Sequence, residues 1–534
     1  MKQLLLVGLI VLLGACGDPT FADLEDGKFD IPKAELAAAR KLIDSAGLSP
    51  DKVHVAERHI GCYSCTAVAV SGGHITQVKF YRAPIKSLAG VDALDHVTSL
   101  KVRYGALEEA IDFCKMDRLA ALDLSHNKIR SLKPGKGCAR LKRIDLKFNQ
   151  LTSLEGLSDM PSLNALELGK NSITTTRGMA RLPRLKKLDL SKQKLTTIEG
   201  MEGLDSLTML NLSHNQLMRA PMPKVPKLVS LNLSNNRIQS INGLENIGPT
   251  LNVLALDTNQ LTSLALPKPL LGVRSLSVNT NKLTSLDGVE SFPALVTLSA
   301  VSNNLASLAA VRRLTKLQKL KVDRNKLVSL ASLSGQDPLP AEAGKLKAKV
   351  KKRRRRKAAR SKLKARAGKG VEATPAQAPM RTLKNLSAGH NAITSLQGIE
   401  HVPYLEALDL RNNKITSIEG IVALALLKEL VVSHNLLTTV KEVKKLKKLK
   451  VLLADHNKLV DTKEVFVAGK RPAYSHYDFR HNLYTGVAAY ILYRGISSGY
   501  RLGGYKRRSY GGYGVRTGSG RSRYSGGGGY RYGK

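Results

Sequence analysis

The chain has 534 residues, of which 43% are hydrophobic, while only 4% are aromatic and tryptophan is absent. A core built almost wholly from leucine, isoleucine and valine argues against a large globular enzyme and favours a repeat solenoid with leucine-like inward positions. The net charge of +43 predicts attraction to polyanions, namely nucleic acid, anionic lipid or acidic polysaccharide.

The first 15 residues have the pattern of a bacterial export signal. An apolar run at residues 4–13 follows a positive start and is too short to span a bilayer. The sequence LGAC at residues 13–16 resembles the bacterial lipobox, in which the cysteine receives a diacylglycerol. Residues 1–15 are therefore predicted to be a lipoprotein signal peptide and Cys16 the lipidated residue. The predicted location is the cell envelope, in the outer membrane or at the cell surface. The alternative is a plain secretory signal with an incidental cysteine.

Residues 16–74 are predicted to form a linker and an N-terminal cap. Residues 32–46 start with proline and end before Gly47, which predicts an amphipathic helix. An even number of further cysteines in an exported chain favours disulfides; they are Cys62, Cys65, Cys114 and Cys138. For the CxxC pair, redox chemistry or metal binding is the alternative to a structural bridge. The other two cysteines are 24 residues apart, close to one repeat length, and are expected to bridge adjacent coils.

A repeat of about 22 residues begins near residue 75 and carries leucine-like residues before an asparagine. Degenerate coils are centred on Ala83 and Gly105, and a looser one on Asn482. Between them the asparagine position is occupied, with Gln193 as a substitute, by Asn127, Asn149, Asn171, Asn215, Asn236, Asn259, Asn281, Asn303, Asn325, Asn391, Asn413, Asn435 and Asn457. We predict repeats over residues 75–330 and 381–494. Within the second range, residues 484–494 are predicted to form the cap at the C-terminal end of the solenoid.

The stretch LDLRNNKITSIEGI at residues 408–421 resembles the leucine-rich repeat family in its 22-residue class, including protein phosphatase 1 regulatory subunits and bacterial internalins. The resemblance implies an α/β solenoid: a horseshoe with a parallel concave β-sheet and short 3₁₀ or irregular convex segments. The leucines point inward and stack between coils, because one coil cannot bury its own apolar face. The asparagines turn inward and bond to backbone groups that the bend leaves unpaired.

Two basic segments lie outside the repeat pattern. Residues 331–380 have a net charge of +12 and are predicted to be an inserted, disordered loop; the alternative is two decayed coils, because the interruption spans three periods. Residues 495–534 form a Gly/Tyr/Arg-rich tail, also predicted to be disordered, which resembles the Arg-Gly-rich tails of RNA-binding proteins. The predicted polyanion-binding residues are Lys351, Lys352, Arg353, Arg354, Arg355, Arg356 and Lys357.

Two rows of side chains are candidates for the concave binding surface. Four residues before the asparagine, successive coils carry Asp123, Asp145, Glu167 and Asp189; these predict a docking patch for a basic partner, or reflect only the repeat consensus. Directly before the asparagine, consecutive coils carry His434, His456 and His481. Those rings could bind a metal or respond to pH; alternatively, the motif recurs by duplication and each ring is solvated.

The sequence carries no recognisable catalytic motif, so we expect a non-enzyme without a cofactor or resident metal. The favoured hypothesis is a monomeric, lipid-anchored repeat protein whose concave face binds a protein while its basic segments contact an anionic polymer. The alternatives are an intracellular scaffold resembling the phosphatase regulators and a nucleic-acid-binding protein that uses the basic loop and tail.

Overall fold

The computed structural model describes residues 19–62, 64–109, 112–133, 138–179, 181–334, 380–460, 476–479 and 481–482. The chain divides into two compact units, Met1–Leu483 and Tyr484–Lys534. The second unit, which includes the predicted end cap at 484–494 and the tail, lies outside the described residues. The description that follows therefore concerns the first unit.

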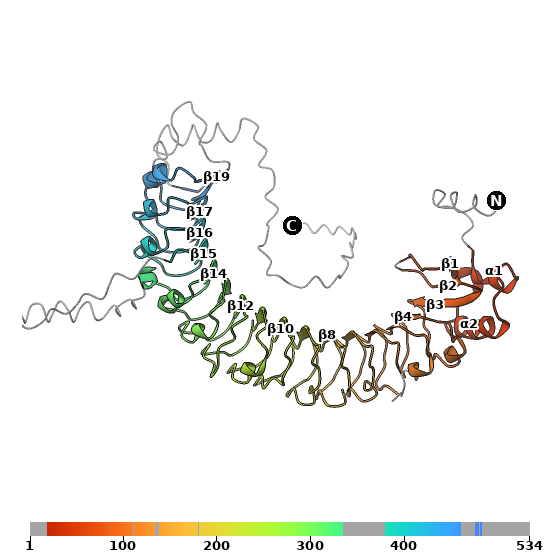
Figure 1. Cartoon of the computed structure of the whole chain (residues 1–534). Coiled ribbons are helices and arrows are strands. Elements are labelled where there is room, and N and C mark those ends of the chain that lie inside the picture. Colours follow the sequence, from red (N-terminus) through yellow and green to blue (C-terminus); the bar gives the residue numbers. More distant parts are fainter. Residues whose placement is uncertain are drawn as a thin grey trace, which may run out of the picture. The chain divides into compact units, whose positions relative to one another are not determined.

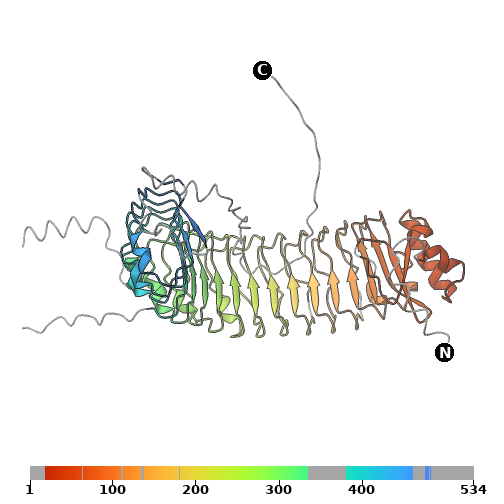
Figure 2. The ribbon, with the colours of Figure 1, turned by 90° about the horizontal axis from the view of Figure 1, so that it is seen from above.

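The first unit is a curved solenoid with a 19-stranded sheet along its inner side (Figures 1 and 2). From β3 to β19 each strand pairs in parallel with the next, and the central leucines of successive strands share one register, as in Leu254 opposite Leu276. The strands are β1 (His54–Glu57), β2 (Ala67–Ser71), β3 (His74–Tyr81), β4 (Ser99–Arg103), β5 (Ala121–Asp123), β6 (Arg143–Asp145), β7 (Ala165–Glu167), β8 (Lys187–Asp189), β9 (Met209–Asn211), β10 (Ser230–Asn232), β11 (Val253–Ala255), β12 (Ser275–Ser277), β13 (Thr297–Ser299), β14 (Lys319–Lys321), β15 (Asn385–Ser387), β16 (Ala407–Asp409), β17 (Glu429–Val431), β18 (Val451–Leu453) and β19 (His476–Asp478).

The outer side of the coils is made of irregular segments and short 3₁₀ turns, because about 22 residues leave no room for a long helix. The 3₁₀ turns are η1 (Pro50–Lys52), η2 (Val91–Ala93), η3 (Phe113–Lys115), η4 (Leu244–Asn246), η5 (Val289–Ser291), η6 (Ala309–Arg313), η7 (Ala331–Ser334), η8 (Ile399–His401), η9 (Ile421–Ala423) and η10 (Lys441–Lys445). The predicted α/β solenoid, with a parallel concave sheet and short 3₁₀ or irregular convex segments, is thus confirmed.

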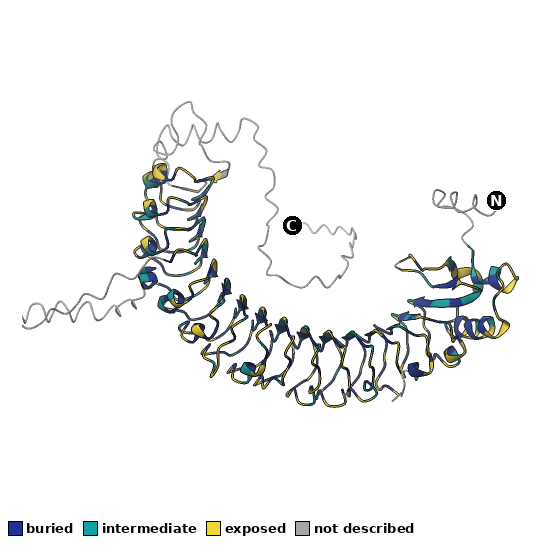
Figure 3. Ribbon diagram, viewed as in Figure 1, coloured by how far each residue is buried: buried dark blue, intermediate teal, exposed yellow. Residues whose placement is uncertain are grey.

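The core is a stack of leucines that repeats from coil to coil. Leu210, Leu254 and Leu298, at the centres of their strands, are at most 2% exposed, and buried residues recur along every described coil (Figure 3). Burying one such side chain stabilises the fold by roughly 1.5–3 kcal/mol. Each leucine is covered by its equivalents one coil away, so the stability resides in the contacts between coils.

The N-terminal cap combines α1 (Phe21–Glu25), α2 (Lys33–Ser45) and the strands β1 to β3. The helix predicted over residues 32–46 is confirmed as α2. The hairpin of β2 and β3, the antiparallel pair of the sheet, was not predicted. It turns at Gly72 and Gly73, whose φ angles of 61° and 74° suit a tight turn that twists with its strands. No helix within the described part of the chain is long and apolar enough to cross a bilayer.

The interruption of the repeat leaves the stack of coils continuous. Strand β14 pairs directly with β15, although Leu320 and its partner Leu386 are 66 residues apart. The two coils are therefore neighbours, which favours an inserted loop over two decayed coils. The predicted boundaries of this loop need correction, because residues 331–334 form η7 with Leu333 fully buried, and Met380 is also buried.

Candidate binding surface on the concave sheet

An asparagine ladder fixes the backbone where each strand ends. Asn127 Nδ2 donates to the carbonyl oxygens of Leu124 in its own coil and Val102 in the preceding coil, at 2.9 and 2.8 Å. Its Oδ1 accepts the backbone N–H of Leu107 at 3.2 Å. The equivalent bonds recur at the ladder positions from Asn149 to Asn457. Gln193 replaces asparagine at one of these positions. Each side chain thus joins two coils and satisfies polar backbone groups that the bend would leave unpaired.

The residues directly before the ladder positions adopt one unusual backbone conformation. We call them the edge row: Arg82, Tyr104, His126, Phe148, Lys170, Lys192, His214, Asn235, Thr258, Thr280, Ser302, Arg324, His390, Asn412, His434, His456 and His481. Their φ angles lie between 53° and 60°, the left-handed region that costs a non-glycine residue on the order of 1 kcal/mol. Because the backbone is the same in every coil, equivalent side chains project in the same direction at the edge of the sheet.

At the N-terminal end, the edge row forms a continuous aromatic stack, the aromatic row Tyr104, His126 and Phe148. The ring centroids are 4.0 Å apart for Tyr104 and His126 and 3.9 Å apart for His126 and Phe148. Lys170 Nζ lies 4.2 Å from the Phe148 centroid, and Arg82 lies over Tyr104 at 5.9 Å. Burial lowers the pKa of His126 below its ordinary value, so its ring stacks as a neutral imidazole at physiological pH.

The aromatic row stays open to solvent although it is ordered by stacking. Tyr104 is 44% exposed and Phe148 is 37% exposed. Aromatic side chains that are rigid before binding lose little conformational entropy when a partner covers them. The row is therefore a preorganised apolar strip with a cation at each end.

The predicted acidic row Asp123, Asp145, Glu167 and Asp189 lies on β5 to β8, beside the aromatic row. Arg103 Nε donates to Asp123 Oδ2 at 2.6 Å. Lys147 pairs with both Asp145 and Glu167, and Lys187 Nζ lies 2.6 Å from Glu167 Oε1. Asp189 is buried and accepts the backbone N–H of Ser191. Asp123, Asp145 and Glu167 are thus paired with basic side chains and Asp189 with a backbone N–H, so the row is not an isolated acidic patch.

Asp145 is the most perturbed carboxyl of this row. Burial raises its pKa to about 6, and the nearby Asp123 carboxylate contributes in the same direction. An aspartate in an unfolded chain has a pKa of about 3.9. The Asp145 carboxyl therefore binds its proton more tightly in the folded chain than in the unfolded chain. The ionised Asp145 therefore destabilises the fold above about pH 6, and this penalty fades as the pH falls toward about 4.

Replacing Asp145 with asparagine is expected to raise the free energy of unfolding by about 2 kcal/mol at pH 7.5 and to leave it unchanged near pH 4. Asparagine keeps the acceptor for the Lys147 backbone N–H but carries no charge to desolvate. Urea midpoints measured across this pH range test the effect, with Asp205→Asn as a control at an exposed position. A D145N variant that is no more stable than the parent at pH 7.5 would contradict the assignment.

The histidines at the other end of the edge row also stack. The ring centroids are 4.0 Å apart for His434 and His456 and 4.2 Å apart for His456 and His481. Asp455 Oδ2 lies 2.9 Å from His456 Nδ1 and 3.9 Å from His434 Nε2. The structure thus brings the predicted histidines together, but the side chains of His434 and His456 are 47% and 41% exposed.

The cysteines of the described chain are paired. Cys114 and Cys138 form a disulfide with Cα atoms 4.5 Å apart, and Cys62 and Cys65 form a second one. The lipidation candidate Cys16 and the predicted polyanion-binding residues 351–357 lie outside the described residues.

Sequence reasoning missed two groups of side chains. The aromatic row was open to prediction, since Tyr104 and Phe148 occupy the same repeat position as His126. The second group, Glu35, His74 and His96 in the cap, has no sequence signal, because its residues come from a helix, the start of a strand and a separate turn.

Comparisons with known proteins agree with this architecture. A family model described as leucine rich repeat matches residues 117–173, 176–217 and 403–459, and one described as leucine rich repeats (2 copies) matches residues 205–246 and 381–423. Among curated protein sequences, none matches the chain.

Several solved bacterial proteins have similar folds. The functional domain of InlJ from Listeria monocytogenes, which includes a cysteine ladder, has 19% identity and a TM-score of 0.48, covering 73% of this chain and 75% of that chain. A leucine-rich repeat protein of Leptospira interrogans has 22% identity and a TM-score of 0.47, covering 73% and 85%. The internalin inlF of Listeria monocytogenes has 16% identity and a TM-score of 0.42, covering 77% and 92%.

Proposed function

Because the chain belongs to the leucine-rich repeat family, a scaffold suited to protein binding, we propose that it is a non-catalytic protein whose concave sheet binds a partner protein. The observation that carries this proposal is the exposed aromatic row at the edge of β4 to β6. Stacked aromatics with flanking cations are typical anchors of protein interfaces, where tyrosine, tryptophan and arginine provide most hot spots.

The charged side chains beside the aromatic row would contribute to the choice of partner more than to the strength of binding. The ion pairs of Arg103, Lys147 and Lys187 with the carboxylates of β5 to β7 are partly exposed. Charges in such positions steer encounter and penalise a wrong register more than they add binding energy. A standard interface covers about 800 Å² on each partner, so a partner seated on the aromatic row would also cover this network.

A photo-reactive phenylalanine analogue placed at position 104 tests the proposal in cells that express the chain. We expect illumination to yield one discrete adduct with a partner protein. The matched control is position 404, since Tyr404 is 40% exposed but lies on the outer turn after η8, away from the sheet. An adduct of equal yield from position 404 would contradict a concave site, and a self-adduct would identify the partner as a second copy.

Phe148→Ala provides a second arm of the same experiment. Because truncating a hot-spot aromatic typically costs about 2 kcal/mol of binding, we expect roughly 30-fold weaker association and loss of the adduct at position 104. Phe148 is 37% exposed, so the variant should fold, which circular dichroism checks. Unchanged adduct yield would remove the aromatic row from the interface.

We also propose that the chain is anchored to the cell envelope through a lipid on Cys16 and that its basic segments, residues 335–379 and 495–534, contact an anionic polymer. The lipobox-like LGAC sequence and the charge of these segments support both ideas. The intact mass of the mature N-terminus in membrane and soluble fractions tests the anchor; a soluble chain that begins at Met1 would contradict it. Competition between DNA, RNA and heparin at fixed salt tests the second idea; no binding to any of them would contradict it.

A further inference from the structure

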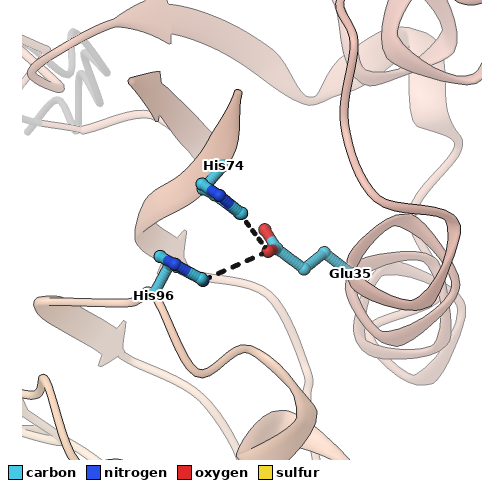
Figure 4. A group of neighbouring side chains, drawn as sticks. All are labelled: Glu35, His74 and His96. Atoms are coloured by element: carbon cyan, nitrogen blue, oxygen red, sulfur yellow. Dashed lines mark hydrogen bonds and ion pairs between the residues drawn. The ribbon is translucent and has the colours of Figure 1, made fainter. Parts of the chain in front are cut away.

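Two histidines and a glutamate converge in the N-terminal cap (Figure 4). Glu35 Oε1 lies 2.6 Å from His74 Nδ1 and 3.4 Å from His96 Nδ1. The two imidazole rings are stacked, with centroids 3.5 Å apart and planes inclined by 8°. Both rings therefore direct the same nitrogen toward one carboxylate oxygen.

The glutamate is buried and held in place from behind. Its side chain is 5% exposed, and its Oε2 accepts the backbone N–H of Ile75 at 2.8 Å. This bond orients the carboxylate so that Oε1 faces the imidazoles, the kind of support that neighbouring groups give to metal ligands. A buried carboxylate needs a charged or hydrogen-bonding partner, and the two nitrogens are on its open side.

We propose that Glu35, His74 and His96 bind a divalent transition-metal ion of the Zn²⁺ type. Two imidazole nitrogens and one carboxylate oxygen are ligands that Zn²⁺ accepts, and the three ligand atoms lie within 4.8 Å of one another. Zinc bonds of about 2.0–2.2 Å place tetrahedral ligands roughly 3.3 Å apart. His74 Nδ1, now 2.6 Å from Glu35 Oε1, would therefore move away from it by roughly 0.7 Å, and the two stacked rings would turn so that both nitrogens face the ion.

The fourth coordination position would face solvent. The His74 and His96 side chains are 34% and 21% exposed, which leaves room for a water ligand. Asp95 is exposed, and its Oδ1 lies 2.9 Å from His96 Nδ1; this contact would be given up to the ion.

The site would join the cap to the solenoid. Glu35 is in the first turn of α2, His74 begins β3 after the Gly72-Gly73 turn, and His96 lies in the turn before β4. An ion at this point links the helix to β3 and to the turn that precedes β4. The role assigned to it is structural: it stabilises the end of the stack, where a solenoid lacks a neighbouring coil.

Titration of the metal-free full chain with Zn²⁺ against a chromophoric chelator tests the site. We expect one tight equivalent per chain and a thermal transition that rises with Zn²⁺. In Glu35→Gln, which keeps the acceptor for Ile75, and in His96→Ala, the tight equivalent should weaken by roughly 100-fold or more. Circular dichroism checks that both variants fold. Because His96 is partly exposed, His96→Ala still tests the site if the substitution at the buried Glu35 prevents folding.

Two matched controls separate this site from other histidines. His54→Ala removes an exposed histidine of the same cap, and His434→Ala/His456→Ala removes the stacked pair at the far end; both should retain the tight equivalent. Equal affinity of the parent and Glu35→Gln would overturn the proposal, as would loss of the tight equivalent in the far-end double variant. None of these results depends on the partner-binding function.

Discussion

Replacing Asn281 with alanine is expected to lower the free energy of unfolding by about 4 kcal/mol. The buried Asn281 side chain accepts the backbone N–H of Leu261 and donates to the carbonyls of Leu256 and Val278, each at 3.0 Å. Alanine leaves these backbone groups buried without the partner, and an unsatisfied buried group costs about 1–3 kcal/mol. Urea unfolding measures the loss, and amide hydrogen exchange at Leu261 should accelerate because its acceptor is gone.

The chain offers its own control for this substitution. Gln193 occupies a ladder position and bonds to Ile173 N and Leu168 O, whereas the asparagines also donate to the carbonyl three residues earlier. Gln193→Asn is therefore expected to be neutral or slightly stabilising. If Asn281→Ala and Gln193→Asn both stay within about 0.5 kcal/mol of the parent, the ladder does not hold the coils together.

Replacing Gly398 with alanine is expected to destabilise the chain on the order of 4 kcal/mol or more. Gly398 has φ +96°, and an added Cβ would lie 2.2 Å from the carbonyl oxygen of Leu330 and 2.7 Å from Ala331 Cα. The backbone of a neighbouring coil cannot move aside without separating the coils, so strain and lost packing add to the unfavourable φ. Leu330 and Gly398 lie on opposite sides of the basic segment in the sequence. Thermal unfolding of Gly398→Ala therefore tests whether the coils before and after that segment are in contact.

Gly203→Ala is the matched control for Gly398→Ala. Gly203 has a similar φ of +77°, but nothing lies within 4 Å of the position its Cβ would take. Only the backbone strain remains, about 1 kcal/mol. Equal losses in both variants would mean that the coils on the two sides of residues 335–379 are not in contact.

The stack of coils was predictable because its physics repeats with the sequence. Each inward leucine and each asparagine, such as Asn149 and Asn171, meets its equivalent one period away, so periodicity alone specifies the neighbour. The same reasoning explains why the stacked rings of His434 and His456 could be anticipated. It also covers the aromatic row, whose members occupy one repeat position.

The cap was less predictable, because no repeat specifies its contacts. The hairpin carried a usable signal, since Gly72-Gly73 separates two β-prone runs, but the parallel pairing of β1 with β2 had none. Glu35, His74 and His96 come together only after α2 packs against the first coils. The ion pairs of Asp145 and Glu167 with Lys147 likewise depend on side-chain geometry that spacing leaves open.

Amide hydrogen exchange of the chain alone and bound to the partner captured at position 104 tests the central claim, that the aromatic edge of the sheet is the binding surface. We predict slower exchange upon binding in peptides that cover β4 to β8 and the edge-row residues Tyr104 to Lys170, and no change in the outer turns η8 to η10. Protection confined to those outer turns, with β4 to β8 unaffected, would contradict it.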